Sequence, residues 1–118
     1  MNIEHLAARL AAYRFRFGTE TDLQDGIEAL LITERIPFQR ERAISASDRP
    51  DFLVEGNLAV EVKIKGSLAQ LLRQASRYAS HPEIAGIVVV GSPRWLATVP
   101  AELCGKPVRA VRLLGSLL

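Results

Sequence analysis

The chain has 118 residues, 48% of them apolar and 24% charged, which is typical of one soluble globular domain with a single core. A single cysteine, Cys104, excludes an internal disulfide, and with only two histidines the chain offers little to a zinc site. No apolar run approaches the roughly 20 residues that span a bilayer. Arginines interrupt the N-terminal segment too often for a signal peptide, so we expect a cytoplasmic protein without membrane contact.

The formal net charge is only +2, but the charges are unevenly distributed. Residues 1–61 carry 11 acidic and 7 basic side chains, whereas residues 62–118 carry 2 acidic and 8 basic ones. A basic second half favours a polyanionic partner such as nucleic acid. A basic solvated surface is the alternative, so the asymmetry supports such a partner without establishing it.

Two helices are predicted in the first third of the chain. Apolar residues at helical spacing indicate a helix over residues 3–14, and we interpret residues 1–17 as an N-terminal helical extension that serves packing or a dimer contact. Thr21 with Gln24 forms a capping-box pattern that opens a second helix. That helix ends near Arg35, because Pro37 disfavours helix at the residue before it.

Residues 38–46 form a polar, weakly alternating stretch, which we interpret as an edge strand or a mobile arm. Arg40 and Arg42 lie within it, where they would either meet phosphates or be solvated.

The stretch 49–65 is the most informative part of the sequence. Two apolar runs flank Gly56-Asn57, which predicts a hairpin with a tight turn at these two residues. Strict alternation in the second run places its branched apolar residues on one face of the sheet and Glu61 with Lys63 on the other.

Asp51 stands where the first strand of this hairpin begins, so strand pairing would bring it near Glu61. Two carboxylates and the Lys63 ammonium would then converge at one end of an apolar sheet. Carboxylates hold divalent cations such as Mg²⁺, which polarise phosphoryl oxygens and acidify bound water. A solvated surface hairpin is the alternative that spacing alone leaves open.

The second half predicts a helix and two strands. Ser67 with Gln70 forms a capping box that opens a helix over residues 67–80. The apolar run 84–90 predicts a strand covered on both faces, and residues 108–114 predict a last strand after a short helical turn and loop over 96–106. We expect Trp95 to be either a core anchor or a base-stacking platform. Because tryptophans are mostly buried in proteins, we favour the core. A strand–helix–strand crossover implies a mixed sheet with helices on both faces.

Pro50-Asp51, a spacer and Glu61-Val62-Lys63 resemble the signature of the PD-(D/E)XK nucleases, which include restriction endonucleases, Holliday-junction resolvases and RecB-type exonucleases. The resemblance implies an α/β fold: a single-domain restriction-endonuclease-like core over residues 1–118, with a mixed central sheet flanked by helices in the order α-β-β-β-α-β-β.

The resemblance also implies roles for particular residues. A glutamate in the first core helix of this family often completes the metal site, and Glu20 matches its E-x-x-apolar pattern. Glu28 is the second choice, and stabilisation of the helix N-terminus is the alternative for Glu20. Gln74 and Tyr78 resemble a glutamine-tyrosine motif that supports the site and meets DNA, with ordinary packing as the alternative. The implied catalytic residues are Asp51, Glu61, Lys63, Glu20 and Gln74. The implied ligands of Mg²⁺ or Mn²⁺ are Asp51, Glu61, Glu20 and the Val62 carbonyl. The expected nucleic-acid contacts are Lys65, Arg73, Arg77, Tyr78, Arg40 and Arg42.

We therefore expect a metal-dependent nuclease that acts on DNA and needs no small-molecule cofactor. A chain this small lacks a separate recognition domain, which favours selectivity for junctions, flaps or ends over sequence specificity. Resolvases of the family are symmetric dimers, so a homodimer is one expectation that the sequence does not decide. The alternatives are a noncatalytic nucleic-acid-binding module or nuclease-complex subunit, and a small protein whose acidic first half docks a basic partner.

Overall fold

The computed structural model describes residues 1–114. Three α-helices occur in this range: α1 Ile3–Ala12, α2 Glu20–Thr33 and α3 Leu68–Ala79. The strands in the same range are β1 Phe38–Arg40, β2 Phe52–Val54, β3 Leu58–Lys63, β4 Gly86–Gly91, β5 Glu102–Leu103 and β6 Lys106–Arg112, and a short 3₁₀ helix, η1, covers Arg94–Thr98.

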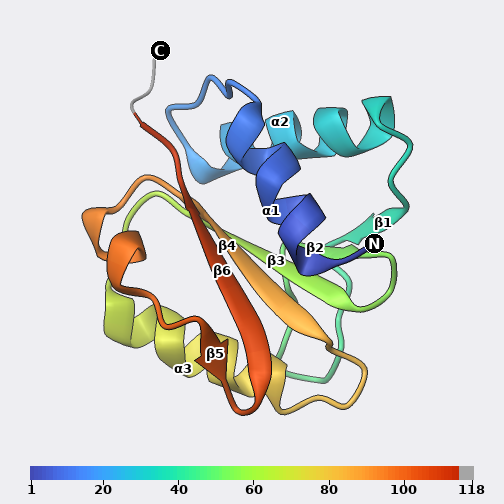
Figure 1. The fold of residues 1–118 in the computed structure, drawn as a ribbon, viewed down its shortest axis with the longest axis vertical. Helices are drawn as coiled ribbons and strands as arrows, with labels where there is room; N and C mark the ends of the chain where they lie inside the picture. The colour runs from blue at the N-terminus through green and yellow to red at the C-terminus, as the bar shows by residue number, and fades with distance from the viewer. Residues whose placement is uncertain (115–118) are drawn as a thin grey trace.

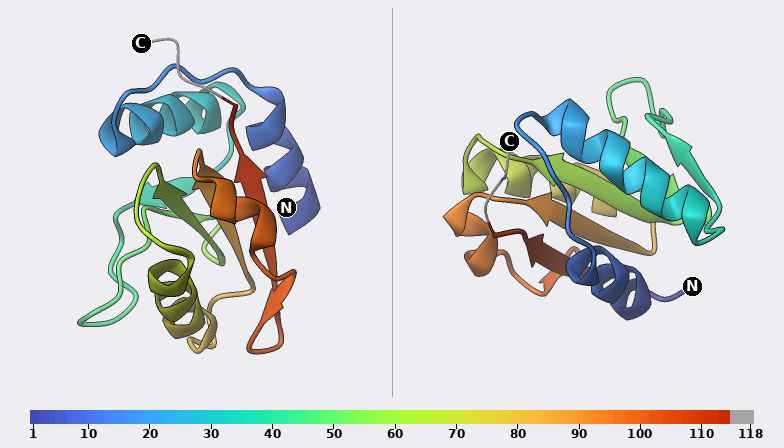
Figure 2. Two further views of the ribbon diagram at one scale, coloured as in Figure 1. Left: turned by 90° about the vertical axis from the view of Figure 1, so that its left-hand side faces the viewer. Right: turned by 90° about the horizontal axis from the view of Figure 1, so that it is seen from above.

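The strands form one mixed open sheet in the order β1-β2-β3-β4-β6-β5. Strands β3, β4 and β6 are parallel neighbours, while β1, β2 and β5 pair antiparallel. Helices α1 and α2 cover one face of the sheet and α3 covers the other (Figures 1 and 2). The prediction of an α/β domain with a mixed sheet between helices is therefore confirmed.

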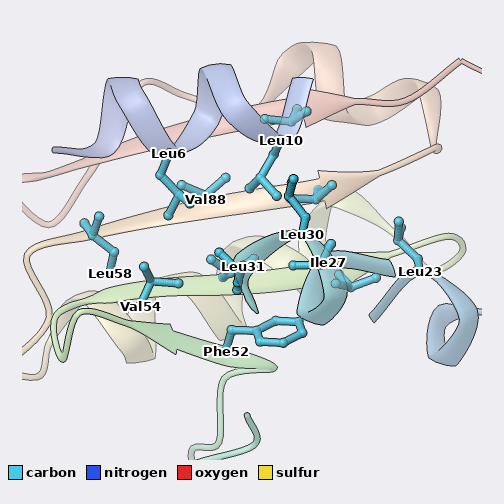
Figure 3. Packing of buried hydrophobic residues seen from close by; sticks show 14 of the residues in the cluster. Leu6, Leu10, Leu23, Ile27, Leu30, Leu31, Phe52, Val54, Leu58 and Val88 are labelled. Atoms are coloured by element: carbon cyan, nitrogen blue, oxygen red, sulfur yellow. The ribbon is translucent and has the colours of Figure 1, made fainter. Parts of the chain in front are cut away.

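The core is divided by the sheet into two clusters. On one face, side chains of α1 and α2 meet β2, β3 and β4, among them Leu6, Leu10, Leu23, Ile27, Leu31, Phe52, Leu58 and Val88 (Figure 3). On the other face, Leu71, Ala75 and Tyr78 of α3 pack on Ala59 and Val89. Leu6 and Leu10 of α1 are fully buried, so the packing role expected for the N-terminal segment is present in the structure.

Helix α2 starts two residues earlier than the capping pattern suggests. Thr19 is the N-cap, and its hydroxyl accepts a hydrogen bond from the Asp22 amide at 3.0 Å, so the Thr21–Gln24 box is not used. Gly26 lies where an added Cβ would be 2.9 Å from the Phe15 ring, which explains a glycine inside this helix. The predicted capping box of α3, Ser67 with Gln70, is confirmed.

One turn and two short strands also differ in part from expectation. The hairpin turn is centred on Glu55-Gly56, one residue before the predicted pair, because both residues adopt positive φ and the Asn57 amide bonds the Val54 carbonyl. Strand β1 is an edge strand, as predicted, but only three residues long, and residues 41–51 form a loop. Strand β5 lies within the stretch expected to be a helical turn and loop.

Within residues 1–114, the helices are too short or too polar for any to span a membrane.

Candidate functional site

The β2–β3 hairpin brings the predicted acidic pair together at the carboxyl end of β3. Phe52 pairs with Val60, so Asp51, one residue before β2, lies beside the position of Glu61. The Asp51 carboxylate accepts a hydrogen bond from the Val62 amide at 2.7 Å, which fixes its side chain against β3. The convergence inferred from strand pairing is therefore present in the structure.

Glu61 is a buried carboxylate with two defined partners. Only 5% of the residue is exposed. One oxygen, Oε1, accepts a hydrogen bond from the Tyr78 hydroxyl at 3.0 Å, and Oε2 lies 3.3 Å from the Lys63 ammonium. Since Tyr78 belongs to α3, Glu61 and Lys63 project to the face opposite Val60 and Val62, as their alternation predicts.

Burial and like charge perturb both acids. Burial raises the pKa of Asp51. Burial, together with the negative charge of Asp51, raises the pKa of Glu61 to about 7, although Lys63 and the Tyr78 hydroxyl act in the opposite direction. The pKa of the Tyr78 hydroxyl is itself raised, first by burial and then by the adjacent Glu61 charge. Two acids held this close favour a shared proton or a cation between them.

Glu20, the first residue of α2, approaches this pair from the other side of the sheet. Its carboxylate accepts a hydrogen bond from the Ile64 amide at 3.3 Å, and its charge contributes to raising the pKa of Asp51. In the described part of the chain, however, no three Asp, Glu, His or Cys side chains gather closely enough to form a complete metal site.

The donor set fits a hard divalent cation in part. Buried Glu61 and half-buried Asp51 supply adjacent carboxylate oxygens, and Glu20 supplies a third carboxylate nearby. Oxygen donors of this kind suit Mg²⁺ or Mn²⁺, which retain several waters and need few protein ligands.

The two expected site residues on α3, Gln74 and Tyr78, differ in their burial and in their hydrogen bonds. Gln74 is half-buried one turn before Tyr78, and no hydrogen bond of its side chain occurs within residues 1–114. Tyr78 is 1% exposed: its ring packs in the core and its hydroxyl supports Glu61, which agrees with the packing alternative and with support of the site, and leaves no surface for a contact with nucleic acid. The residue continues the apolar stripe of α3, on the side of the helix that faces the sheet.

The expected cationic contacts divide into paired and unpaired groups. Arg40 donates to Asp25, Glu28 and Gln24 on α2, so its guanidinium is held within the protein. Arg42 donates to Gln39 and Arg77 to Asp48. Lys65 and Arg73 are exposed, with no hydrogen bond or ion pair to another described residue, and remain available to a ligand.

Sequence reasoning missed Asp48. This buried carboxylate, 5% exposed, accepts hydrogen bonds from Arg77 Nε at 2.9 Å and pairs with His81 Nε2 at 3.1 Å. Burial acts to raise its pKa, but the His81 and Arg77 hydrogen bonds outweigh burial and lower it. The contacts attach the loop that carries Asp51 to the end of α3, and nothing in local sequence signals a pairing across 29 or 33 residues.

Trp95 also has a positional role. The residue is half-buried against the core cluster between the sheet and α3, in agreement with the core position that the sequence favours. Its indole donates a hydrogen bond to the Gly66 carbonyl at 3.0 Å. This bond ties η1 to the loop that leaves β3, next to Lys63 and Lys65.

The fold and site define a single-domain α/β protein with a mixed six-stranded open sheet and an acidic pair at the carboxyl end of β3. No protein-family model, curated protein or solved structure matches the chain. The resemblance to the PD-(D/E)XK nucleases therefore rests on the chain's own residues.

Proposed function

We propose that this protein is a divalent-metal-dependent nuclease that hydrolyses DNA phosphodiester bonds, with a PD-(D/E)XK-type site on a restriction-endonuclease-like core. One observation carries the proposal: the Asp51 and Glu61 carboxylates meet at the end of β3, with the Lys63 ammonium 3.3 Å from Glu61. A buried like-charge pair is destabilising unless it serves a cation or a proton, and such perturbed acids gather at functional sites.

Each residue has a role that follows from its position. Asp51 and Glu61 would hold Mg²⁺ or Mn²⁺, joined by Glu20 and the Val62 carbonyl. When bound, the ion supplies polarisation of a phosphoryl oxygen and a lower pKa for its bound water. Lys63 neutralises charge that develops on the phosphate and orients the attacking water. Tyr78 holds Glu61 in one orientation through the 3.0 Å hydrogen bond.

The substrate follows from size and charge. The basic half of the chain supplies exposed Lys65 and Arg73 beside and beyond the site, which suits a polyanionic strand. The small domain described fits a structural feature such as a junction, flap or end better than a long specific sequence. A homodimer would place two sites on two strands.

Cleavage of linear, single-stranded, flapped and four-way DNA in Mg²⁺ or Mn²⁺ tests the proposal. The Asp51→Asn and Lys63→Met variants should each cleave DNA at least about a hundredfold more slowly than the wild type. The first change removes a proposed metal ligand, and the second removes the charge that would neutralise the phosphate. Glu83→Gln, which changes an exposed carboxylate in the segment before β4, at the opposite end of β3 from Asp51 and Lys63, should cut like the wild type. Cutting that persists in both site variants would disprove this site.

The second candidate is a nucleic-acid-binding module without hydrolysis. The Lys63–Glu61 ion pair favours it, because the ammonium already lies where it compensates the Glu61 charge. Binding of the same DNA panel without metal-dependent cleavage by the folded wild type would select this candidate.

A further inference from the structure

Lys63 has a counterpart two strands away. Lys63 pairs with Gly91 of β4, and Gly91 pairs with Arg112 of β6. Neighbouring strands are about 4.8 Å apart. Arg112 therefore stands in the same row of the sheet as Lys63, at the same carboxyl edge, roughly 10 Å along it.

Arg112 also lines a cavity of about 400 Å³ where the chain leaving α1 passes the end of β6. The connection between α1 and α2 lies beside the end of β6 in the views of Figures 1 and 2. Tyr13, Arg14 and Phe15 of this connection line the cavity together with Leu113, and no acidic residue lines it within residues 1–114.

Two arginines line this cavity, Arg14 and Arg112. Both are exposed, and neither guanidinium group has a hydrogen bond or an ion pair with another described residue. Other arginines are paired within the fold, such as Arg9 with Glu34 and Arg109 with Glu4. Two unpaired cations in one acid-free cavity attract an anion, and guanidinium groups match the geometry of phosphate.

The cavity also presents an aromatic surface. Tyr13 is 46% exposed, and its ring centroid lies 4.8 Å from that of Phe15, which is 8% exposed. The buried Phe15 ring supports Tyr13 from one side and leaves the tyrosine available to a planar group. A base can stack on such a ring without sequence preference.

We propose that this cavity is a nucleotide-binding subsite, in which Arg14 and Arg112 hold a backbone phosphate and Tyr13 stacks on the attached base. The subsite deepens the proposed nuclease function and rests on it: the bound nucleotide belongs to the substrate strand, displaced along the sheet edge from Asp51 and Glu61.

Fluorescence anisotropy with a labelled single-stranded DNA dodecamer, in EDTA so that cleavage is silent, tests the subsite. Arg14→Ala, Arg112→Ala and Tyr13→Ala should each weaken binding about five- to tenfold. Tyr13→Phe should bind like the wild type, because it keeps the ring. The matched control is Arg35→Ala, which removes an exposed, unpaired arginine beyond the far end of α2.

The outcomes separate the subsite from the proposed hydrolysis. Weaker binding in the Arg14, Arg112 and Tyr13→Ala variants, with each variant's circular dichroism and melting unchanged, supports the subsite whether or not the wild type cleaves DNA. Wild-type affinity in Arg14→Ala and Arg112→Ala would overturn it, even if metal-dependent cleavage is established. Failure of the folded wild type to bind the dodecamer would overturn it as well, and the cleavage panel would then decide the nuclease function separately.

Discussion

Glu61 is a single residue whose environment opposes its charge. It is almost completely buried and faces Asp51, and within residues 1–114 its charge is compensated by Lys63 and one hydroxyl hydrogen bond. Its pKa of about 7, against a usual 4.5, means that the folded protein binds this proton more tightly than the unfolded chain does. The stabilisation from this proton is complete below about pH 4.5 and is lost as the pH rises through about 7.

We predict that Glu61→Gln stabilises the metal-free protein at alkaline pH. The amide oxygen still accepts the Tyr78 hydrogen bond, while the buried like charge disappears. At pH 8 the variant should exceed the wild type in free energy of unfolding by up to about 3 kcal/mol, and the difference should shrink toward pH 5. Urea unfolding in EDTA at several pH values measures this difference. Glu83→Gln is the exposed control, and a difference independent of pH would contradict the prediction.

At the scale of elements, the site depends on how closely β3 and β4 approach. A Cβ atom built on Gly91 would lie 1.6 Å from the Lys63 carbonyl oxygen, which is backbone and cannot rotate away. Gly91 therefore allows the strand ends to pack together where Lys63 is positioned.

Gly91→Ala should accordingly destabilise the protein by about 3 kcal/mol and displace Lys63, because β4 must shift to relieve the collision. Gly105→Ala is the matched control. Gly105 has a φ of +77°, but no atom lies within 4 Å of an added Cβ, so this variant should lose only about 1 kcal/mol of unfolding free energy. Urea unfolding of both variants checks the ranking. Equal losses of unfolding free energy in the two variants would show that β4 can accept a side chain at residue 91 next to Lys63.

The loop before β2 is a second element that the site needs. Asp48 attaches it to Arg77 and His81 at the end of α3, three residues before Asp51. The Asp48→Asn variant should lose about 2 kcal/mol of unfolding free energy, because it weakens the charge-assisted contacts with Arg77 and His81 at a buried position.

The same Asp48→Asn change should speed tryptic cleavage after Arg42, since the loop would open more often. Urea unfolding and timed proteolysis measure the two effects. Glu41→Gln, in the same loop but exposed, should change neither of them. Unaltered cleavage in Asp48→Asn would mean that other contacts hold the loop.

At the scale of the whole molecule, cations without a partner among the described residues collect along the carboxyl edge of the sheet. Lys65 follows β3, Arg94 follows β4, and Arg112 ends β6 with Arg14 beside it. The protein has a small net charge of +2, so any strong electrostatic binding must come from this local arrangement.

DNA binding should therefore depend steeply on salt. Four phosphate contacts with a single strand predict a slope of log affinity against log salt of about −3, or roughly a fiftyfold loss between 50 and 200 mM salt. Anisotropy titrations at several salt concentrations measure the slope. Arg112→Ala should reduce its magnitude by about 0.7, whereas Arg35→Ala should not change it. A slope near zero would contradict binding along this edge.

Local pattern in the sequence determined much of this protein. Alternation in β3 decided that Glu61 and Lys63 share a face, because strand side chains repeat every two residues. The hairpin signal placed Asp51 near Glu61, and the continuous apolar run marked β4 as buried on both faces. These features depend on neighbours in the chain or across one turn.

Tertiary structure alone decided which side chains complete the site. Tyr78 reaches Glu61 across 17 residues, Asp48 meets Arg77 across 29, and Ile64 donates to Glu20 across 44. The cavity at Arg14 and Arg112 likewise exists only because the chain leaving α1 passes the end of β6. Such contacts depend on how helices dock on the sheet, and docking is decided by packing of the whole core, which periodicity in one segment does not encode.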